Sequence, residues 1–452
     1  MRIIVIGDGR VGHTLAEHLC QENHDVTIID NDEEAIQRSE NNLDALCLKA
    51  NGANAQALIE AGAERADIVI STTPNDETNM VCCMFAKQLG AKYTIARIRN
   101  PDYNESLMML QDRMSIDMAI NPERTTAIEI SRLLRFPFAS NLESFARGKV
   151  EMIEFRAQER DPFVDKALKD VPDVLPRVLY AAVERDGGIH IPSGDFIIHA
   201  GDRVHIVGAP GTITKYFRIL GRGTSRVRNV MLLGGSKISY YLAKILEPMG
   251  MHINIIEIDP KSAEYLSEIL PNVNIILGDG TDQELLQEEG LQQMDAFVAL
   301  SDRDEENLMA GLYAARQGIR KVIVKNNRSG YGDIFSSLGL ESVVSPRSIT
   351  CSTILRYVRA RANGNGADSI EKLYRIMGGQ AEAVEFIVQE TDKCINIPLK
   401  DLNIQKNVLV AVIVRKGEVI VPFGNDHLEP GDSVVIIAAR SGISELSEVI
   451  RQ

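Results

Sequence analysis

The residues best suited to ligand chemistry lie in the glycine-rich segment GDGRVG at positions 7–12. This G-x-G-x-x-G spacing is typical of a turn that holds the pyrophosphate of a dinucleotide. Gly7 permits a tight turn, Gly9 lets a phosphate approach the backbone, and Gly12 lets the following helix pack closely on the strand. The helix that begins there offers N–H donors and the positive end of its dipole. We therefore predict a dinucleotide-binding turn; a glycine-rich turn in a sheet without a ligand is the alternative.

A carboxylate ends the predicted strand that follows this helix. Asp30 closes the apolar run DVTIID, at the position where an acidic residue accepts a hydrogen bond from a ribose 2′-hydroxyl. The next residues, NDEEAIQ (31–37), contain no arginine that would neutralise a 2′-phosphate. The sequence therefore favours NAD(H) over NADP(H) as the cofactor.

Two further groups follow later apolar runs. Thr72 and Thr73 come at the end of DIVIST, and Arg97 comes at the end of YTIARI. Because the carboxyl ends of parallel strands meet at one edge of a sheet, we expect these side chains near the glycine turn. A hydroxyl pair and a guanidinium could hold ribose or phosphate there. A structural salt bridge is the alternative for Arg97.

The chain contains this arrangement twice. Residues 3–19 align with residues 230–246, and the following strands pair Asp30 with Glu257. Similarity that persists through half of the chain indicates a tandem duplication of a whole structural unit.

The second glycine turn departs from the pattern. The segment GGSKIS (234–239) keeps Gly234 but has Ser236 and Ser239 where the first turn has glycines. A side chain at the first of these positions crowds a phosphate, and one at the second pushes the helix away from the strand. The sequence predicts a weaker or different nucleotide site here, with NAD(H), a smaller or differently posed adenine nucleotide, or no ligand as the alternatives.

The candidate binding residues are therefore two sets, one in each half. Those of the first half are Gly7, Asp8, Gly9, Arg10, Val11, Gly12, Asp30, Thr72, Thr73 and Arg97. Those of the second half are Gly234, Gly235, Ser236, Lys237, Ile238, Glu257, Asp279, Ser301 and Lys325.

Alternating apolar and helical segments define the architecture that positions these residues. In each half they predict an α/β fold, a Rossmann-like, doubly wound parallel sheet. Short strands punctuated by glycine, proline and aspartate follow each sheet and predict a small α+β module. We place the four domains at residues 1–122, 140–222, 228–346 and 370–452.

A helix is predicted after each sheet, within residues 121–136 and 345–360. Asn121 and Ser345 are suitable N-caps, and a proline follows each of them at the first helical position. Both helices carry an apolar stripe. We expect each stripe to pack against another helix. Because the duplication makes one chain a pseudo-dimer, we also expect further pairing to close a symmetric oligomeric ring.

Composition limits the partners. The 452-residue chain has 49 basic and 63 acidic side chains, and its net charge of −14 argues against a nucleic-acid partner. Six cysteines without CxxC or zinc-ligand spacing are expected to be reduced, apolar core residues. The sequence shows neither a signal-peptide pattern nor a run of about 18 uncharged apolar residues, so we predict a soluble, cytoplasmic protein.

The histidines do not favour catalysis. A dehydrogenase needs an acid–base group beside its substrate, but none of the eight histidines recurs at matched positions in the two halves. The acidic runs NDEE (31–34) and RDEEN (303–307) are more typical of solvated helix starts than of metal sites. The sequence predicts a binding protein and not an enzyme, without catalytic or metal-ligating residues. An NAD-dependent oxidoreductase with its substrate between the two halves is the alternative.

The order of the four domains, together with GDGRVG, IID, NDETNM and ARIRNPDY, resembles the TrkA family over essentially the whole chain. Members of that family are cytosolic regulators of Trk potassium uptake, built from RCK (or KTN) domains of N and C type. The resemblance implies that residues 7–11, Asp30, Thr73 and Arg97 hold NAD(H). It also implies ATP and ADP as ligands. GGSKIS departs from the glycine-richer second turn of the family, which puts a second NAD(H) site in doubt.

The resemblance further implies a function and partners. The chain would be a nucleotide-sensing regulatory subunit that gates a membrane potassium channel or transporter subunit of the TrkH or TrkG kind. It would form a homo-oligomer, a tetrameric ring, in the cytoplasm. Its partner would hold it at the inner face of the plasma membrane.

Overall fold

The computed structural model describes most of the chain. The described residues are 1–103, 115–136, 139–172, 174–222, 227–328, 334–335, 338–340, 342–362, 370–376, 380–439, 443 and 445–449. They form two compact units. The first unit comprises Met1–Thr126 with Ser345–Val358, and the second comprises Ala127–Val344 with Arg359–Gln452.

The first unit contains a six-stranded parallel sheet of strand order β3-β2-β1-β4-β5-β6. Its strands are β1 (Arg2–Ile6), β2 (Asp25–Asp30), β3 (Leu46–Lys49), β4 (Ile68–Ser71), β5 (Tyr93–Arg97) and β6 (Met118–Ile120). Its helices are α1 (Arg10–Gln21), α2 (Glu33–Asn42), α3 (Ala55–Glu60) and α4 (Asp76–Leu89). The strand order changes direction between β1 and β4, which places the carboxyl ends of these strands at the usual ligand-binding edge.

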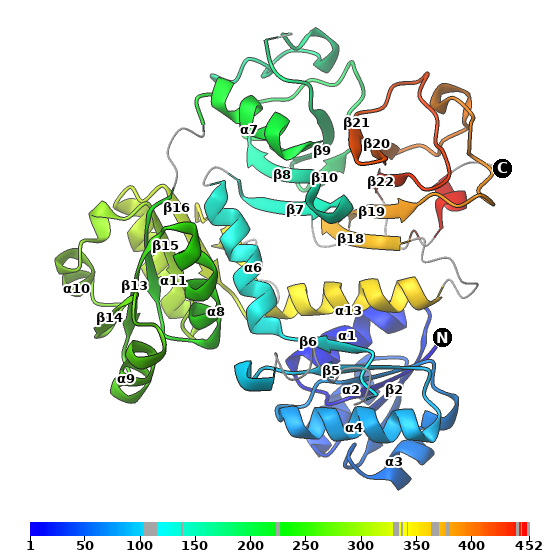
Figure 1. Cartoon of the computed structure of the whole chain (residues 1–452), viewed down its shortest axis with the longest axis vertical. Coiled ribbons are helices and arrows are strands. Elements are labelled where there is room, and N and C mark those ends of the chain that lie inside the picture. The colour runs from blue at the N-terminus through cyan, green and yellow to red at the C-terminus, as the bar shows by residue number, and fades with distance from the viewer. Residues whose placement is uncertain are drawn as a thin grey trace. The chain divides into compact units, whose positions relative to one another are not determined.

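A helix from the second half of the chain completes this unit. The helix α13 (Pro346–Ala362) lies beside α1 in Figure 1. Its buried side chains share a hydrophobic cluster with residues of α1 on one face of the sheet. From α13 these are Cys351, Ile354, Leu355 and Val358, and from α1 they are Leu15, Ala16 and Leu19. The apolar stripe of α13 is thus covered within the chain by another helix, and the expectation of a helix partner is confirmed.

The second unit repeats the sheet, in the order β14-β13-β12-β15-β16-β17. Its strands are β12 (Asn229–Leu233), β13 (His252–Glu257), β14 (Asn274–Leu277), β15 (Ala296–Ala299), β16 (Lys321–Lys325) and β17 (Ser342–Val344). Its helices are α8 (Lys237–Leu246), α9 (Pro260–Ile269), α10 (Gln283–Glu288) and α11 (Asp304–Arg316). The two equivalent sheets confirm the predicted α/β class and the duplication.

The first of the two long connecting helices packs on this second sheet. The helix α6 (Pro122–Arg135) contributes Ala127, Ile130, Leu133 and Leu134 to a cluster that also contains Ile238 and Leu242 of α8. Its stripe is therefore covered within the chain as well. The physical reason is that each stripe finds its apolar partner far away in the sequence, on the sheet of the other half.

Both connecting helices begin at the predicted caps. The side chain of Asn121 accepts a hydrogen bond from the N–H of Arg124 at 2.8 Å. The hydroxyl oxygen of Ser345 accepts one from the N–H of Ser348 at 3.4 Å. These contacts satisfy N–H groups that the helices leave unpaired at their first turns.

Two five-stranded antiparallel sheets complete the second unit. The first consists of β7 (Asn141–Phe145), β8 (Val150–Arg156), β9 (Leu179–Arg185), β10 (Gly188–His190) and β11 (Arg203–Gly208), followed by α7 (Pro210–Ile219). The second consists of β18 (Ile370–Ile376), β19 (Ala381–Ile387), β20 (Val408–Arg415), β21 (Glu418–Ile420) and β22 (Ser433–Ala438). Short 3₁₀ turns occur at Ala63–Arg65, Ala146–Gly148, Leu168–Asp170, Glu247–Met249, Leu291–Gln293, Leu399–Asp401 and Leu446–Val449.

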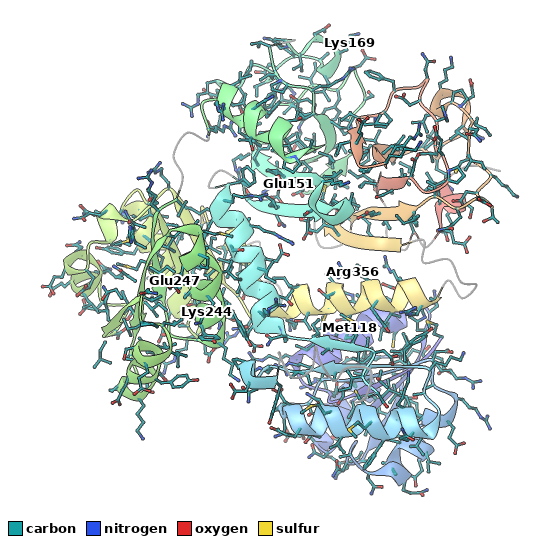
Figure 2. The ribbon with its side chains drawn as sticks, viewed as in Figure 1. Met118, Glu151, Lys169, Lys244, Glu247 and Arg356 are labelled. Atoms are coloured by element: carbon teal, nitrogen blue, oxygen red, sulfur yellow. The ribbon has the colours of Figure 1, made fainter. Side chains whose placement is uncertain are left out.

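The two antiparallel sheets pack on each other through one apolar cluster, to which Val150, Met152, Ala411 and Val435 contribute. An arginine near the end of each connecting helix pairs with a buried glutamate of these sheets. Arg135 pairs with Glu151, the residue labelled on β8 in Figure 2, and Arg359 pairs with Glu382 at 3.2 Å. Each connecting helix is thus tied by charge to the small module that follows it.

Two expectations from composition can be compared with the structure. All six cysteines are free thiols, and Cys82, Cys83, Cys351 and Cys394 are buried. Burial raises the pKa of the Cys82 thiol to about 11, which disfavours the reactive thiolate. No helix among the described residues is both long and apolar enough to cross a membrane.

Candidate nucleotide sites

The first glycine turn is built as its spacing predicts. Gly7 has a φ of +93°, and a Cβ there would lie 2.9 Å from the backbone nitrogen of Thr73. A Cβ at Gly12 would lie 1.8 Å from the carbonyl oxygen of Gly7. Only glycine fits at either position, because side chains disfavour this φ and real Cβ contacts are never that short.

The turn leaves open space where a phosphate would approach. A Cβ built at Gly9 would meet no atom within 4 Å. Gly9 is also the N-cap residue of α1, and no side chain caps that helix. The first turn of α1 therefore presents N–H donors and a positive dipole end without an internal acceptor for them, which is the arrangement that binds anions.

Asp30 is tied directly to this turn. Its Oδ2 accepts a hydrogen bond from the backbone N–H of Asp8 at 2.5 Å, and its Oδ1 accepts one from Asp32 at 2.9 Å. The carboxylate is half-buried at the end of β2. Its remaining lone pairs can accept from a ribose hydroxyl, as the sequence predicts.

Asp8 is a fully buried carboxylate beneath the turn. Its Oδ2 accepts a hydrogen bond from the Ser39 hydroxyl at 2.6 Å, and His13 Nδ1 lies 3.2 Å from its Oδ1. Burial raises the pKa of Asp8, although the hydrogen bond from Ser39 opposes this shift. The predicted preference for NAD(H) rests on the absence of an arginine in residues 31–37, and Arg38 is the next residue along the chain. It donates to the carbonyl oxygen of Asp8 at 3.3 Å, so the turn itself engages this guanidinium.

The hydroxyl groups of the two threonines at the sheet edge form hydrogen bonds within the protein. Thr72 is buried, and its hydroxyl lies 3.1 Å from the carbonyl oxygen of Gly7. The Thr73 hydroxyl donates to Asn79 Oδ1 at 2.7 Å. Both hydroxyl hydrogens are therefore used within the protein, and a ligand would meet these oxygens as acceptors.

Asn79 organises this edge, and the sequence analysis did not single it out. Its Oδ1 also accepts from the backbone N–H of Thr73, and its Nδ2 donates to the carbonyl oxygen of Arg97 at 2.8 Å. One buried amide thus joins the ends of β4 and β5. A signal was present in the sequence, because Asn79 and Asn307 occupy matched positions of NDETNM and RDEENL.

Arg97 is half-buried and forms no ion pair in the part of the chain that the structure describes. Its Nε is buried and has no hydrogen-bond partner there. Burial, and after it the charge of Arg99, lowers the pKa of Arg97, whereas the carboxylates of Glu123 and Asp76 raise it. A partly buried guanidinium at a sheet edge is suited to an anionic ligand. For the alternative of a structural salt bridge, the structure offers only these two carboxylates, neither of which is in direct contact.

Arg10 and Val11 begin α1 after the open turn. The side chain of Arg10 is exposed, and Val11 is half-buried. The carbonyl oxygen of Val11 accepts a hydrogen bond from Cys351 of α13 at 3.7 Å. The glycine turn and α13 are therefore in direct contact inside the first unit.

The second turn has the same backbone conformation as the first turn but leaves less room for a phosphate. Gly234 again has a φ of +93°, and Gly235 donates its N–H to Glu257 Oε2 at 2.5 Å. This bond matches the one between Asp8 and Asp30. A Cβ at Gly235 would lie 2.5 Å from the side chain of Leu266 and 2.8 Å from Glu257 Oε2, so a larger residue would require these side chains to move.

The two serines of the second turn satisfy groups that the first turn leaves open. Ser236 caps α8, because its hydroxyl oxygen accepts from the N–H of Ser239 at 3.3 Å. The Ser239 hydroxyl donates to the carbonyl oxygen of Gly234 at 2.5 Å. Lys237 is exposed and Ile238 is buried. The start of α8 is thus partly occupied by the protein's own side chains.

The other candidates of the second half are also engaged internally. Ser301 donates its N–H to Asn307 Oδ1 at 2.9 Å, as Thr73 does to Asn79. Lys325 is buried, but its Nζ lies 2.9 Å from the exposed carboxylate of Asp302. The exposed Asp279 accepts from the N–H and hydroxyl of Thr281, and these bonds lower the pKa of Asp279.

This duplicated nucleotide-type fold, with an antiparallel module after each sheet, defines the class of tandem RCK-domain proteins. The TrkA-N domain family matches residues 3–122 and 230–346, and the TrkA-C domain family matches residues 152–221 and 383–451. The chain belongs to the TrkA family, which confirms the resemblance stated from the sequence.

Individual relatives agree over the full length. The chain is 35% identical to the Trk system potassium uptake protein TrkA homolog 1 of Methanosarcina mazei, covering 100% of both chains. It is 34% identical to the Trk system potassium uptake protein TrkA of Vibrio alginolyticus, over 96% of this chain and 95% of that one. It also shares its fold with the GsuK channel bound to NAD, with a TM-score of 0.63 and 15% identity over 97% of this chain and 76% of that one.

Proposed function

We propose that this chain is the nucleotide-sensing regulatory subunit of a potassium-uptake system and that its first Rossmann domain binds NAD(H). As a tetrameric ring on the cytoplasmic side of the plasma membrane, it gates a membrane potassium subunit of the TrkH or TrkG kind. The names of its full-length relatives support the transport system. The uncapped helix start beside the open space at Gly9 is the observation that carries the nucleotide site.

The residues of the first turn fit a dinucleotide. The N–H groups at the start of α1 would hold the pyrophosphate, and Asp30 would accept from a ribose hydroxyl. The unpaired guanidinium of Arg97 would gain an anionic partner. The second turn offers less, because Ser236 already caps its helix. We expect about one NADH per chain, with any additional binding at the second turn being of ATP, ADP or another adenosine phosphate.

The contact between Val11 and Cys351 supplies a route for regulation. A ligand that moves the first turn of α1 displaces Val11, whose carbonyl oxygen accepts a hydrogen bond from Cys351 of α13. The same helix carries Arg359, which pairs with Glu382 in the antiparallel module. A nucleotide shifts this arrangement only by binding one conformation better than another, so different nucleotides can drive different states of the ring.

Calorimetric titration of the full chain tests the assignment of the site. Hydrogen bonds to charged groups contribute about 1.5–3 kcal/mol, so Asp30→Ala is expected to weaken NADH binding about 10- to 100-fold. The matched variant Glu257→Ala should leave NADH affinity unchanged. Parent affinity in Asp30→Ala, or two equivalent tight NADH sites per chain, would contradict the assignment. Tighter binding of NADPH than of NADH would contradict the cofactor.

Reconstitution tests the function. The protein is combined in vesicles with the potassium subunit encoded in its own genome, and potassium flux is measured with NAD⁺, NADH, ATP, ADP or no nucleotide. The proposal expects flux to depend on both protein and nucleotide, and light scattering to show an oligomer. A monomer, or flux indifferent to the protein and to every nucleotide, would exclude it.

A further inference from the structure

A second cluster of ligand-type side chains lies far from both glycine turns, on the first antiparallel sheet. Glu154 of β8, Glu184 of β9 and His205 of β11 each offer an atom, and these atoms lie within 4.8 Å of one another. His205 Nε2 is 2.8 Å from Glu184 Oε1. His205 and Glu154 are direct partners in the register of β11 and β8. Three neighbouring strands thus point one imidazole and two carboxylates at a common place.

This cluster is largely buried. His205 is 1% exposed and Glu154 is 8% exposed, and the side chain of Glu184 is 12% exposed. Arg203 lies 3.2 Å from Glu154. Two carboxylates, one guanidinium and one imidazole therefore share a place where water is scarce, and a bound cation would add favourable charge there.

His205 presents one ring nitrogen to the cluster. Its Nε2 faces Glu184 at 2.8 Å, whereas its Nδ1 is buried and finds no partner among the residues described in the structure. An ion at Nε2 would leave Nδ1 as it is, so the argument for a metal rests on the ligand set. An imidazole nitrogen that faces two carboxylates is a common metal ligand.

The duplicated sheet shows that the fold does not require these groups. Glu385 of β19 occupies the position of Glu154 and is paired in register with Val435. The sequence places Val435 and Val414 where the first sheet has His205 and Glu184. Glu385 instead accepts from Ser433 and from the N–H of Ala146. Valine packs well at both positions, so polar groups were not needed to build the sheet.

We propose that His205, Glu184 and Glu154 bind a divalent transition-metal cation such as Mn²⁺, Co²⁺ or Zn²⁺. One imidazole and two carboxylates suit such ions better than Mg²⁺ or Ca²⁺, which prefer oxygen ligands alone. Binding requires the three atoms to close to about 2.0–2.2 Å from the ion. A pocket of about 430 Å³ reaches the cluster at Glu184, and its lining also includes Arg156, Arg185 and Arg203.

Metal binding by the tag-free full chain tests this site. Protein treated with EDTA is desalted and titrated with Mn²⁺, Co²⁺ or Zn²⁺, and bound metal is counted by native mass spectrometry. Visible absorption of the Co²⁺ form reports the ligand geometry. We expect one ion per chain, and at least about a 10-fold weaker affinity in His205→Val. This variant copies the second sheet, and Glu184→Gln is a second variant that preserves the hydrogen-bonding shape.

The control is His199→Ala, which removes an exposed histidine that lies 2.6 Å from Asp165. It should retain the ion, because a pair of exposed groups is not a built site. Failure of the parent chain to retain any of the three metals would overturn the proposal. So would equal metal content in His205→Val and the parent, or equal loss in His199→Ala. None of these outcomes bears on NADH binding, so the proposed function is tested separately.

Discussion

The two Rossmann-type domains share their sheet order and their edge asparagines, yet they treat the same ligand-binding edge differently. In the first, the start of α1 has no side-chain cap and Arg97 has no ionic partner in the described residues. In the second, Ser236 caps α8 and Lys325 pairs with Asp302. The first domain leaves the N–H donors of α1 and the guanidinium of Arg97 available to an external acceptor. The second domain supplies acceptors for α8 and Lys325 from its own chain.

This difference between the two domains indicates which features of the fold decide whether a nucleotide binds. The backbone of the turn, with its positive φ at Gly7 and Gly234, is the same in both halves. The acidic residue that accepts from the turn, Asp30 or Glu257, is also retained. What changes is whether the N–H groups at the start of the helix, and the cation at the sheet edge, already have partners within the chain. Four experiments, ordered by expected effect, test this comparison.

Gly12→Ser should have the largest effect, because it imports the residue of the second turn into the first. Its Cβ would lie 1.8 Å from Gly7 O. Forcing atoms into such a packed position costs about 1–3 kcal/mol, and we expect loss of detectable NADH binding as well. Denaturant unfolding and calorimetry measure the two effects.

The reverse change, Ser239→Gly, is the control for this variant. It removes the hydroxyl that donates to Gly234 O, at a cost of about 1 kcal/mol, and should leave NADH binding intact. Gly12→Ser with the parent's stability and affinity would show that the turns differ for another reason.

Arg97→Met and Lys325→Met compare the cations that end β5 and β16. If the Arg97 guanidinium serves an anionic ligand, its loss weakens NADH binding about 10- to 100-fold, while the free protein is as stable as the parent or more so. Lys325→Met breaks a pair with an exposed carboxylate and should cost less than about 1 kcal/mol, with no change in NADH affinity. Titration and thermal unfolding of both variants provide the measurement. Equal loss of NADH affinity in both would contradict the comparison.

The sequence predicted those features of the structure that depend on residues close to one another in the chain. The φ requirement at Gly7, the cap at Asn121 and the carboxylate at the end of β2 depend on neighbouring residues, and the structure contains each of them. The sequence predicted a helix partner for the stripes of α6 and α13 but not which helix, because the apolar partners come from the other half of the chain. The role of Asn79 was missed because its amide joins two strand ends that only the folded sheet brings together.

Ser236→Gly should open the second turn at a small cost. Replacing a serine N-cap by glycine costs only a few tenths of a kcal/mol, roughly, while it exposes N–H donors at the start of α8. In an Asp30→Ala background, where the first site is weakened, we expect ADP to bind several-fold tighter than without the change. Adding Glu257→Ala should remove that gain. Unchanged ADP affinity would mean that the capping serine does not limit the second site.

Asp8→Asn comes last, because the effect that tests the comparison is a change in how the free energy of unfolding varies with pH. The second turn has Gly235 at this position, so a buried carboxylate beneath the turn is unique to the first half. Burial raises the pKa of Asp8 above its ordinary value of 3.8. Its contribution to stability is therefore fully present below pH 3.8 and is lost as the pH rises through the raised pKa, because the unfolded chain releases the proton first. The amide of the variant does not titrate, so its free energy of unfolding should vary less with pH across that window, whatever constant cost the lost bonds to Ser39 impose. Urea unfolding at a series of pH values measures the slope, with the exposed Asp25→Asn as the control that should keep the parent's pH dependence. A variant slope as steep as the parent's would show that Asp8 is ionised in the folded protein as readily as in the unfolded chain.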